Sequence, residues 1–259
     1  YHREGRYPLE LPFIPGQEGA GVIEEIGAAV SGWSIGDRVA WVMVPSSYAE
    51  YVSVPARLLS RIPDTVSADL AAAVMLQGLT AHYLVTSVYP ADNTTTAVVH
   101  AAAGGVGLLL TQMLKARGAT IIGTVSSEEK VARAMEAGAS HVIRYDQEPW
   151  EEKTRELVGD KKVDVVYDGV GQATFEAGLT VLRPRGLMAL YGAASGAVPP
   201  FDLQRLNGLG SLTITRPNLG DFVRTPEELA WRVGDIFDAV LAGTLSVAIA
   251  KTLPLDDAA

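Results

Sequence analysis

From about residue 96 onward the chain alternates strand-like and helix-like segments, and this alternation constrains the fold more than any other feature. In chain order, the strand-like runs are TAVVHA, TIIGTV, HVIRY, VDVVYDGV, GLMALYG and SLTITRP. The predicted helices between and after them cover residues 105–118, 127–138, 149–159, 173–186 and 202–209. Strands and helices joined by short links predict βαβ units. We therefore expect an α/β fold of the Rossmann type, a doubly wound parallel sheet with helices on both faces.

The first third of the chain has a different texture, with short β-like runs separated by Gly and Pro. These runs are GAGVIEEIG, GDRVAWVMVP, YAEYVSVP and LLSRIP, and they predict a compact β domain. A helix is expected over residues 67–88, with Ser67 as its N-cap and an interruption at Gly78. The C-terminal part predicts a helix that starts with Thr225 and Pro226, followed by the short strand SVAIAKTLP.

A glycine cluster follows the first strand of the alternating region, in the sequence HAAAGGVG. It is close to the G-x-G-x-x-G dinucleotide fingerprint, although Ala102 stands where the first glycine is usual. Gly104 and Gly105 let the backbone approach a diphosphate, Val106 follows in the turn, and Gly107 permits close packing of helix on strand. The first turn of the helix offers free N–H groups and a positive dipole end to phosphates. The alternative is a strand-to-helix turn that binds nothing, but the strand–turn–helix context favours a dinucleotide.

The end of the next strand indicates which dinucleotide is bound. NAD sites usually place a carboxylate at this strand tip, where it accepts hydrogen bonds from the ribose hydroxyl. Here the strand ends at Ser126 and Ser127, the acids Glu128 and Glu129 lie in the following helical turn, and Lys130 comes next. Hydroxyls and an ammonium group suit a 2′-phosphate, so the pattern favours NADPH over NADH. The alternatives are helix capping by the serines and a solvated lysine.

Three further sites lie at or just after the carboxyl ends of predicted strands. This is the sheet edge where ligands bind in open α/β folds. Tyr145 ends the third strand, and it fits either an adenine or phosphate contact or ordinary packing. The segments DGVG (168–171) and YGAASG (191–196) each follow a buried-looking strand.

Composition narrows the classes of partner. The net charge is −9 and the pI is about 5.0, which disfavours nucleic acid and anionic membrane as partners. The chain has no cysteine, which excludes disulfides and thiolate zinc sites and fits a cytoplasmic location. The most apolar run, AVVHAAAGGVGLLLTQML, contains polar and glycine interruptions and is not expected to span a membrane.

Several blocks together resemble the zinc-free quinone oxidoreductases of the medium-chain dehydrogenase/reductase superfamily. They are HAAAGGVG, GTVSSEEK, VVYDGVG, GLMALYGAASG and TRPNL, with YHREGRYP, PGQEGAGVIEEIG and QGLTAHYL earlier in the chain. The resemblance covers essentially the whole chain. It implies a GroES-like β domain, truncated at both ends here, joined to a Rossmann domain. The implied ranges are 1–78 for part of the β domain, 79–220 for the NADPH-binding domain and 221–259 for the return to the β domain.

The resemblance also implies a set of cofactor contacts in this chain. Gly78 and Thr80 match a helix contact near the nicotinamide, Gly105 and Val106 match the diphosphate turn, and Lys130 and Tyr145 match a 2′-phosphate clamp. In the family, further contacts with the ribose and nicotinamide come from the carboxyl ends of two strands. The matching residues here are Gly169, Val170, Tyr191, Gly192 and Ser195. A further basic residue of the family, also near the phosphate, would lie beyond Ala259.

The resemblance implies NADPH-dependent reduction of a quinone or another conjugated carbonyl by a cytoplasmic homodimer without metal. Gly16, Gln17 and Glu18 stand where zinc relatives have G-H-E, and an amide is a poor zinc ligand. Tyr1 and Tyr7 match positions that line the quinone end of the pocket, and whether either one donates a proton stays open. The sequence identifies no catalytic residue. Two alternatives remain: an enone or alkenal double-bond reductase, and a non-catalytic NADPH-binding protein.

Overall fold

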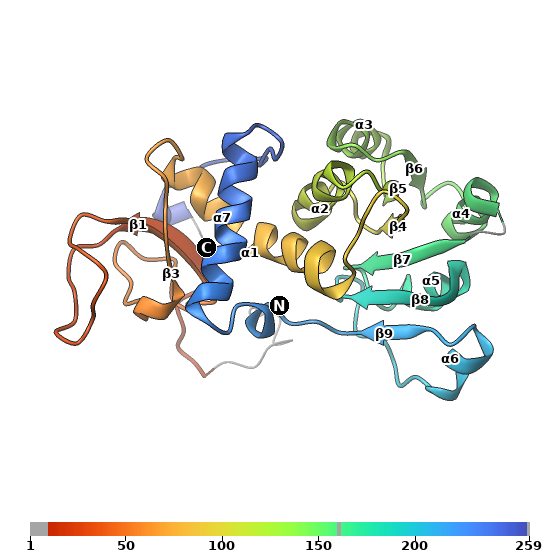
Figure 1. Cartoon of the computed structure of the whole chain (residues 1–259), viewed down its shortest axis with the longest axis horizontal. Coiled ribbons are helices and arrows are strands. Elements are labelled where there is room, and N and C mark those ends of the chain that lie inside the picture. Colours follow the sequence, from red (N-terminus) through yellow and green to blue (C-terminus); the bar gives the residue numbers. More distant parts are fainter. Residues whose placement is uncertain (1–9, 160–161, 258–259) are drawn as a thin grey trace. The chain divides into compact units, whose positions relative to one another are not determined.

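The computed structural model describes residues 10–159 and 162–257 and divides the chain into two compact units. The first unit combines the chain up to Leu79 with the chain from Phe222 onward, and the second is Thr80–Asp221. Each unit has its own sheet: β1–β3 are red to orange in Figure 1, and the sheet of the second unit runs from yellow-green to light blue.

The second unit contains a six-stranded sheet in the order β6-β5-β4-β7-β8-β9, in which all neighbouring strands are parallel. Its strands are β4 (Thr96–Val99), β5 (Thr120–Val125), β6 (His141–Arg144), β7 (Val163–Asp168), β8 (Leu182–Leu190) and β9 (Thr213–Thr215). The chain starts in the middle of the sheet, proceeds to one edge, and then returns to build the other half. This order reverses between β4 and β7, and it confirms the predicted doubly wound Rossmann sheet.

Helices cover the two faces of this sheet. They are α2 (Gly105–Ala116), α3 (Glu128–Ala137), α4 (Trp150–Val158), α5 (Phe175–Val181) and α6 (Gln204–Gly208). Helix α2 packs against α3, and α4 packs against α5, so that the two pairs lie on opposite faces (Figure 1). Trp150, Phe175 and Leu179 of α4 and α5 share one core with Val98 and Val166 of the sheet. Because both faces are buried, the central strands are continuous apolar runs.

The first unit contains a small antiparallel sheet in the order β1-β2-β3. Its strands are β1 (Glu18–Val22), β2 (Arg38–Val42) and β3 (Leu59–Arg61). Helix α7 (Pro226–Leu241) begins as predicted, because the Thr225 hydroxyl accepts the N–H of Glu228 at 3.2 Å and Pro226 occupies the first turn. Helix α1 (Ala68–Tyr83) starts after Ser67, whose hydroxyl accepts the N–H of Leu70 at 3.3 Å. The described residues also contain three short 3₁₀ segments: η1 (Ala56–Leu58), η4 (Leu219–Phe222) and η5 (Leu255–Asp257).

Four details of the predicted elements are wrong. Helix α1 passes through Gly78 without interruption and continues as a π-helical segment, η2 (Leu84–Val88). Helix α5 ends at Val181, and residues 182–186, predicted as helical, begin strand β8. The runs at 48–55 and 246–254 form no strand. Both runs have suitable composition, but neither pairs with a neighbouring strand among the described residues, and β-propensity without a pairing partner does not make a strand.

Helix α1 with η2 is long and apolar enough to cross a membrane by length and composition alone. In the structure 61% of its most apolar window is buried, as in the core helix of a globular protein. The run AVVHAAAGGVGLLLTQML instead divides into β4, a turn and α2.

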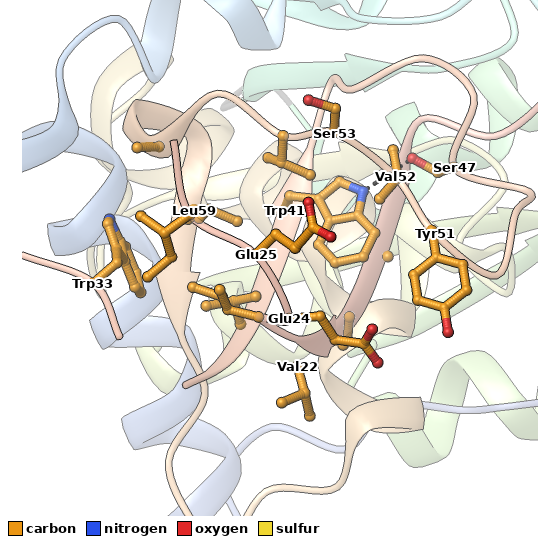
Figure 2. Close-up of a pocket in the computed structure, with 18 of the residues that line it drawn as sticks. Val22, Glu24, Glu25, Trp33, Trp41, Ser47, Tyr51, Val52, Ser53 and Leu59 are labelled. Carbon is orange, nitrogen blue, oxygen red and sulfur yellow. Dashed lines mark hydrogen bonds between the residues drawn. The ribbon is translucent and has the colours of Figure 1, made fainter. Parts of the chain in front are cut away.

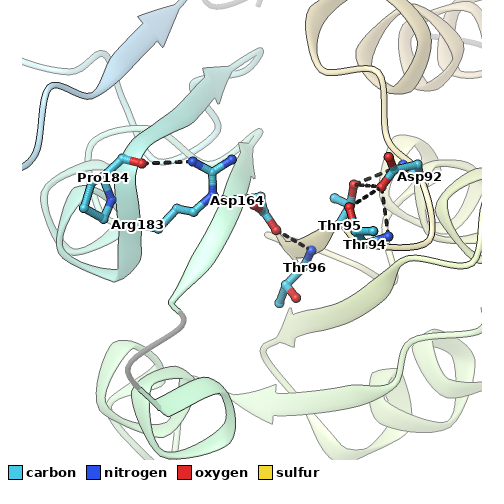
Figure 3. A network of polar contacts seen from close by, with 7 residues as sticks. All are labelled: Asp92, Thr94, Thr95, Thr96, Asp164, Arg183 and Pro184. Atoms are coloured by element: carbon cyan, nitrogen blue, oxygen red, sulfur yellow. Dashed lines mark hydrogen bonds and ion pairs between the residues drawn. The ribbon is translucent and has the colours of Figure 1, made fainter.

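Polar contacts fix the amino-terminal edge of the six-stranded sheet (Figure 3). The Asp164 carboxylate on β7 accepts the N–H of Thr96 on β4 at 2.7 Å and pairs with the Arg183 guanidinium on β8. Asp92 holds the turn before β4 by accepting the N–H and the hydroxyl of Thr94 at 2.8 and 2.7 Å. These bonds connect the adjacent strands β4, β7 and β8 at the amino-terminal edge. Most of the predicted site residues lie at the opposite, carboxyl-terminal edge.

Candidate cofactor-binding site

The turn between β4 and α2 is built to bring its backbone close to a ligand. Ala101 adopts a left-handed backbone conformation with φ of 52°, and its carbonyl accepts the N–H of Gly104 at 2.8 Å. A Cβ on Gly107 would overlap that same carbonyl oxygen and lie 2.9 Å from the backbone of Ala102, so only glycine fits there. Gly104 and Gly105 are exposed.

The first turn of α2 presents N–H groups that have no acceptor within the helix. The first intrahelical bond runs from the N–H of Leu108 to the carbonyl of Gly104 at 2.9 Å. The N–H groups of Gly105, Val106 and Gly107 precede it, and no side chain caps the helix at Gly104. A diphosphate fits this arrangement, because its oxygens would supply the missing acceptors at the positive end of the helix dipole.

The alanine at position 102 is accommodated by a glycine on the neighbouring strand. A Cβ added to Gly123 of β5 would lie 2.8 Å from the Cβ of Ala102, and the N–H of Ala102 bonds to the carbonyl of Thr124 at 3.1 Å. The methyl group of Ala102 therefore takes the space left by Gly123. This explains how the turn keeps its shape without the first glycine of the fingerprint.

The end of β5 brings together the hydroxyls and the lysine predicted to hold a 2′-phosphate. The Nζ of Lys130 donates to the Oγ of Ser126 at 2.8 Å. Ser127 is the N-cap residue of α3, but its side chain makes no capping bond. Tyr145, which follows the adjacent strand β6, donates its N–H to the carbonyl of Val125 at 3.2 Å, and its side chain is 47% exposed. These residues share one corner of the sheet edge, and their contact with a cofactor stays a prediction.

The loops after β7 and β8 pack against each other with almost no space between them. A Cβ on Gly169 would lie 2.8 to 2.9 Å from the ring and hydroxyl of Tyr191, and one on Gly192 would overlap the backbone of Gly169. The N–H groups of Tyr191 and Gly192 both donate to the carbonyl of Asp168, at 2.9 and 3.2 Å. These glycines are therefore required by packing between loops, whether or not a ligand also contacts them.

Asp168, for which sequence reasoning predicted no role of its own, organises the loop after β7. Its side chain is fully buried, and Oδ1 accepts the N–H groups of Val170 and Gly171 at 2.7 and 2.9 Å. The Thr174 hydroxyl donates to the same carboxylate at 2.8 Å. The signal in the sequence was a carboxylate at the end of a buried apolar strand, where a charged group needs several donors.

Ser195 connects the two loops. Its hydroxyl donates to the carbonyl of Val170 at 2.9 Å and accepts the N–H of Ala173 at 3.0 Å. Its own N–H donates to Val170 as well, at 2.8 Å. The structure therefore gives Ser195 a role in holding the loops, in addition to the predicted cofactor contact.

The remaining predicted residues lie on other elements. Gly78 and Thr80 are both buried on α1, where a Cβ on Gly78 would lie 2.8 Å from Val74 Cγ2. Tyr1 and Tyr7 lie outside the described residues.

Histidine 100 occupies the buried end of β4, as the sequence indicated. Its Nδ1 lies 2.8 Å from the hydroxyl of Thr124, and its ring meets Trp150 edge-on with centroids 4.4 Å apart. Its Nε2 has no hydrogen-bond partner among the described residues. Burial lowers the pKa of His100 to about 4, and the charge of Asp168 partly opposes this shift.

A hollow of about 960 Å³ lies in the first unit, on the small antiparallel sheet (Figure 2). Trp33, Trp41, Val52 and Leu59 line it, with Glu25 among them. None of the predicted cofactor contacts lines this hollow.

The described residues contain no cluster of three or more His, Asp or Glu side chains that could hold a metal ion. Glu18 instead accepts the N–H of Leu76 at 2.6 Å, and burial raises its pKa. The absence of zinc from the protein stays a prediction.

A parallel sheet with reversed strand order, an uncapped helix start after its first strand, and polar residues at the next strand tip define a dinucleotide-binding Rossmann unit. Comparison with known proteins identifies the family to which the chain belongs. Residues 105–233 match the family model "Zinc-binding dehydrogenase", and residues 1–64 match "Alcohol dehydrogenase GroES-like domain".

The chain is 41% identical over 261 residues to a quinone oxidoreductase of Pseudomonas aeruginosa, across 100% of this chain and 80% of that protein. It is 40% identical to a 2-haloacrylate reductase of Burkholderia, again across 100% of this chain and 80% of that protein. A mycobacterial protein solved in complex with NADPH is 47% identical, with a TM-score of 0.95 over 100% of this chain and 80% of its own. The chain belongs to the quinone oxidoreductase family of the medium-chain dehydrogenase/reductase superfamily, which confirms the predicted resemblance.

Proposed function

We propose that this protein reduces quinones with NADPH by hydride transfer and without zinc. The observation that carries the proposal is the uncapped start of α2. There the N–H groups of Gly105, Val106 and Gly107 precede the first intrahelical bond and can donate to an anion. The quinone oxidoreductase name of the Pseudomonas relative and the NADPH complex of the mycobacterial relative support the same cofactor and substrate class.

The chain contributes binding and orientation to this reaction. The first turn of α2 holds the diphosphate, and Ser126, Ser127 and Lys130, with Tyr145, hold the 2′-phosphate. The loops after β7 and β8, locked by Asp168, provide a rigid surface for the ribose and nicotinamide. NADPH supplies the hydride when it is bound.

A quinone accepts hydride readily and then takes up a proton, so the reaction does not require a dedicated acid. Asp168 is an unsuitable proton donor, because its buried carboxylate already accepts bonds from Val170, Gly171 and Thr174. We propose Tyr1 and Tyr7 as residues of the quinone pocket, in line with the family resemblance.

The test is NADPH oxidation with 1,4-benzoquinone, 9,10-phenanthrenequinone and an enone side by side, with NADH as the matched control. The proposal expects quinone-dependent oxidation that is faster with NADPH than with NADH. Tight NADPH binding without turnover of any acceptor would indicate a non-catalytic NADPH-binding protein instead.

The alternative function is reduction of a conjugated double bond in an enone or alkenal. It is favoured by one observation, the 40% identity to a 2-haloacrylate reductase. Faster turnover of the enone than of either quinone would select this alternative.

The domain boundaries, the cellular location and the oligomeric state are also proposals. Residues 1–78 and 221–259 would belong to the GroES-like domain and residues 79–220 to the NADPH-binding domain, and the protein would act in the cytoplasm as a homodimer. Sedimentation at several protein concentrations would test the dimer.

A further inference from the structure

The corner of the sheet that is proposed to bind the 2′-phosphate also carries carboxylates. Val125, the last residue of β5, pairs in register with Arg144, the last residue of β6. Glu128 and Glu129 occupy the first turn of α3, next to Ser126 and Ser127, and Asp146 follows Tyr145. A dianionic phosphate at Lys130 would therefore approach a helix turn that bears negative charge.

The guanidinium of Arg144 bridges two of these carboxylates. Its Nη1 lies 2.9 Å from Oε2 of Glu128, and its Nε and Nη2 bind the two carboxylate oxygens of Asp146 at 3.2 and 2.8 Å. The side chain of Arg144 is 22% exposed, whereas that of Glu128 is 80% exposed. The less exposed arginine thus holds the exposed carboxylate of Glu128, which directly follows Ser126 and Ser127 in the chain.

This ion pair spans two elements that meet only in the folded sheet. Glu128 begins α3, and Arg144 lies sixteen residues later at the end of β6. A local stabilising role for Glu128 needs no partner, because an acid in the first turn of a helix is already favourable. The pair with Arg144 instead fixes where its negative charge lies, beside the residues proposed to meet the phosphate.

We propose that Arg144 determines specificity for the 2′-phosphorylated cofactor by neutralising and holding Glu128 at the start of α3. Arg144 does not need to contact the phosphate for this role. It reduces the repulsion that an uncompensated Glu128 carboxylate would exert on the 2′-phosphate of a bound cofactor. The inference rests on the proposed NADPH site and adds a residue to it.

The experiment compares dissociation constants of NADPH and NADH by calorimetry for wild type, Arg144→Gln, Glu128→Gln and the double variant. Arg144→Gln should weaken NADPH binding about 3- to 10-fold, since exposed charges in water interact weakly. NADH binding should change less than about twofold, because NADH carries no 2′-phosphate. Glu128→Gln in the Arg144→Gln background should restore NADPH affinity, and added salt should shrink the Arg144→Gln defect.

Arg205→Gln is the matched control. Arg205 forms an exposed two-point ion pair with Glu176, at 2.9 and 2.6 Å, on α6 and α5. Its loss changes net charge by the same amount and should leave both dissociation constants unchanged. Thermal unfolding of each variant checks that the second unit is folded.

Each outcome has a defined meaning. Equal weakening of NADPH and NADH by Arg144→Gln, without rescue by Glu128→Gln, would assign Arg144 a purely structural role and overturn the inference. If the ratio of the NADPH and NADH dissociation constants is unchanged in Arg144→Gln, the inference is also overturned, but the proposed function stands. A wild-type protein that binds both cofactors equally well would overturn the NADPH preference and this inference with it.

Discussion

Acidification should destabilise the second unit through His100, because its buried ring cannot accept a proton without cost. Burial lowers its pKa to about 4 in the folded chain, and an unfolded histidine has a pKa of about 6.5. Between these two values the unfolded chain binds a proton that the folded chain does not. Stability from His100 is therefore fully present above pH of about 6.5 and is lost as the pH falls toward about 4.

The size of the effect follows from the same two pKa values. Between about pH 7 and about pH 4.5, protonation of His100 in the unfolded chain should lower the free energy of unfolding by about 2 kcal/mol. Carboxylates also titrate near the lower end of this range, so a single pH series in the wild type does not isolate the histidine.

Replacement of His100 by Asn isolates the effect, since an amide does not titrate and can still bond to the Thr124 hydroxyl. Urea unfolding of both proteins at the two pH values can be followed by tryptophan fluorescence, to which the second unit contributes Trp150 and the first unit the other three tryptophans. The wild type should lose about 2 kcal/mol more than His100→Asn on acidification. His141→Asn, which removes an exposed histidine, is the control and should keep the wild-type pH dependence.

Equal losses in wild type and His100→Asn would refute the reasoning. They would mean that the buried ring accepts a proton as easily as an exposed one, or that water reaches Nε2 in the folded protein.

Three other changes test the proposed site. Lys130→Glu should weaken NADPH binding by about 1.5–3 kcal/mol, or roughly 10- to 150-fold, and shift preference toward NADH; unchanged NADPH affinity in a titration would remove Lys130 from the clamp. Gly107→Ala should destabilise the second unit by about 1–3 kcal/mol, because its methyl group meets the Ala101 carbonyl. Gly104→Ala, whose Cβ would lie 3.1 Å from the same oxygen, should cost less in the same urea experiment, and the reverse order would contradict the packing argument. Metal analysis of dialysed protein should find far less than one zinc per chain, and a stoichiometric amount would refute the zinc-free assignment.

Much of the secondary structure could be predicted from the sequence because its signals are local. The strand and helix periods, the caps at Ser67 and Thr225 and the glycine turn after β4 each depend on neighbouring residues, and the structure confirms them. The runs at 48–55 and 246–254 were predicted as strands and are not, because a strand exists only where another strand pairs with it. Gly78 was expected to interrupt α1, but the helix continues through it, and a Cβ at this position would lie 2.8 Å from Val74 Cγ2.

In the candidate site, too, some features could be predicted from local sequence and others depend on tertiary contacts. Sequence alone predicted a diphosphate turn and a patch of hydroxyls and a lysine for the 2′-phosphate, and it identified the family, because all three depend on residue types at fixed spacing. Only the tertiary structure showed that Gly123 makes room for Ala102, that the Asp168 carbonyl binds the start of the loop after β8, and that Arg144 pairs with Glu128. Each of these contacts joins residues from different strands or loops, and their distances are set by the packing of the sheet, which no local pattern encodes.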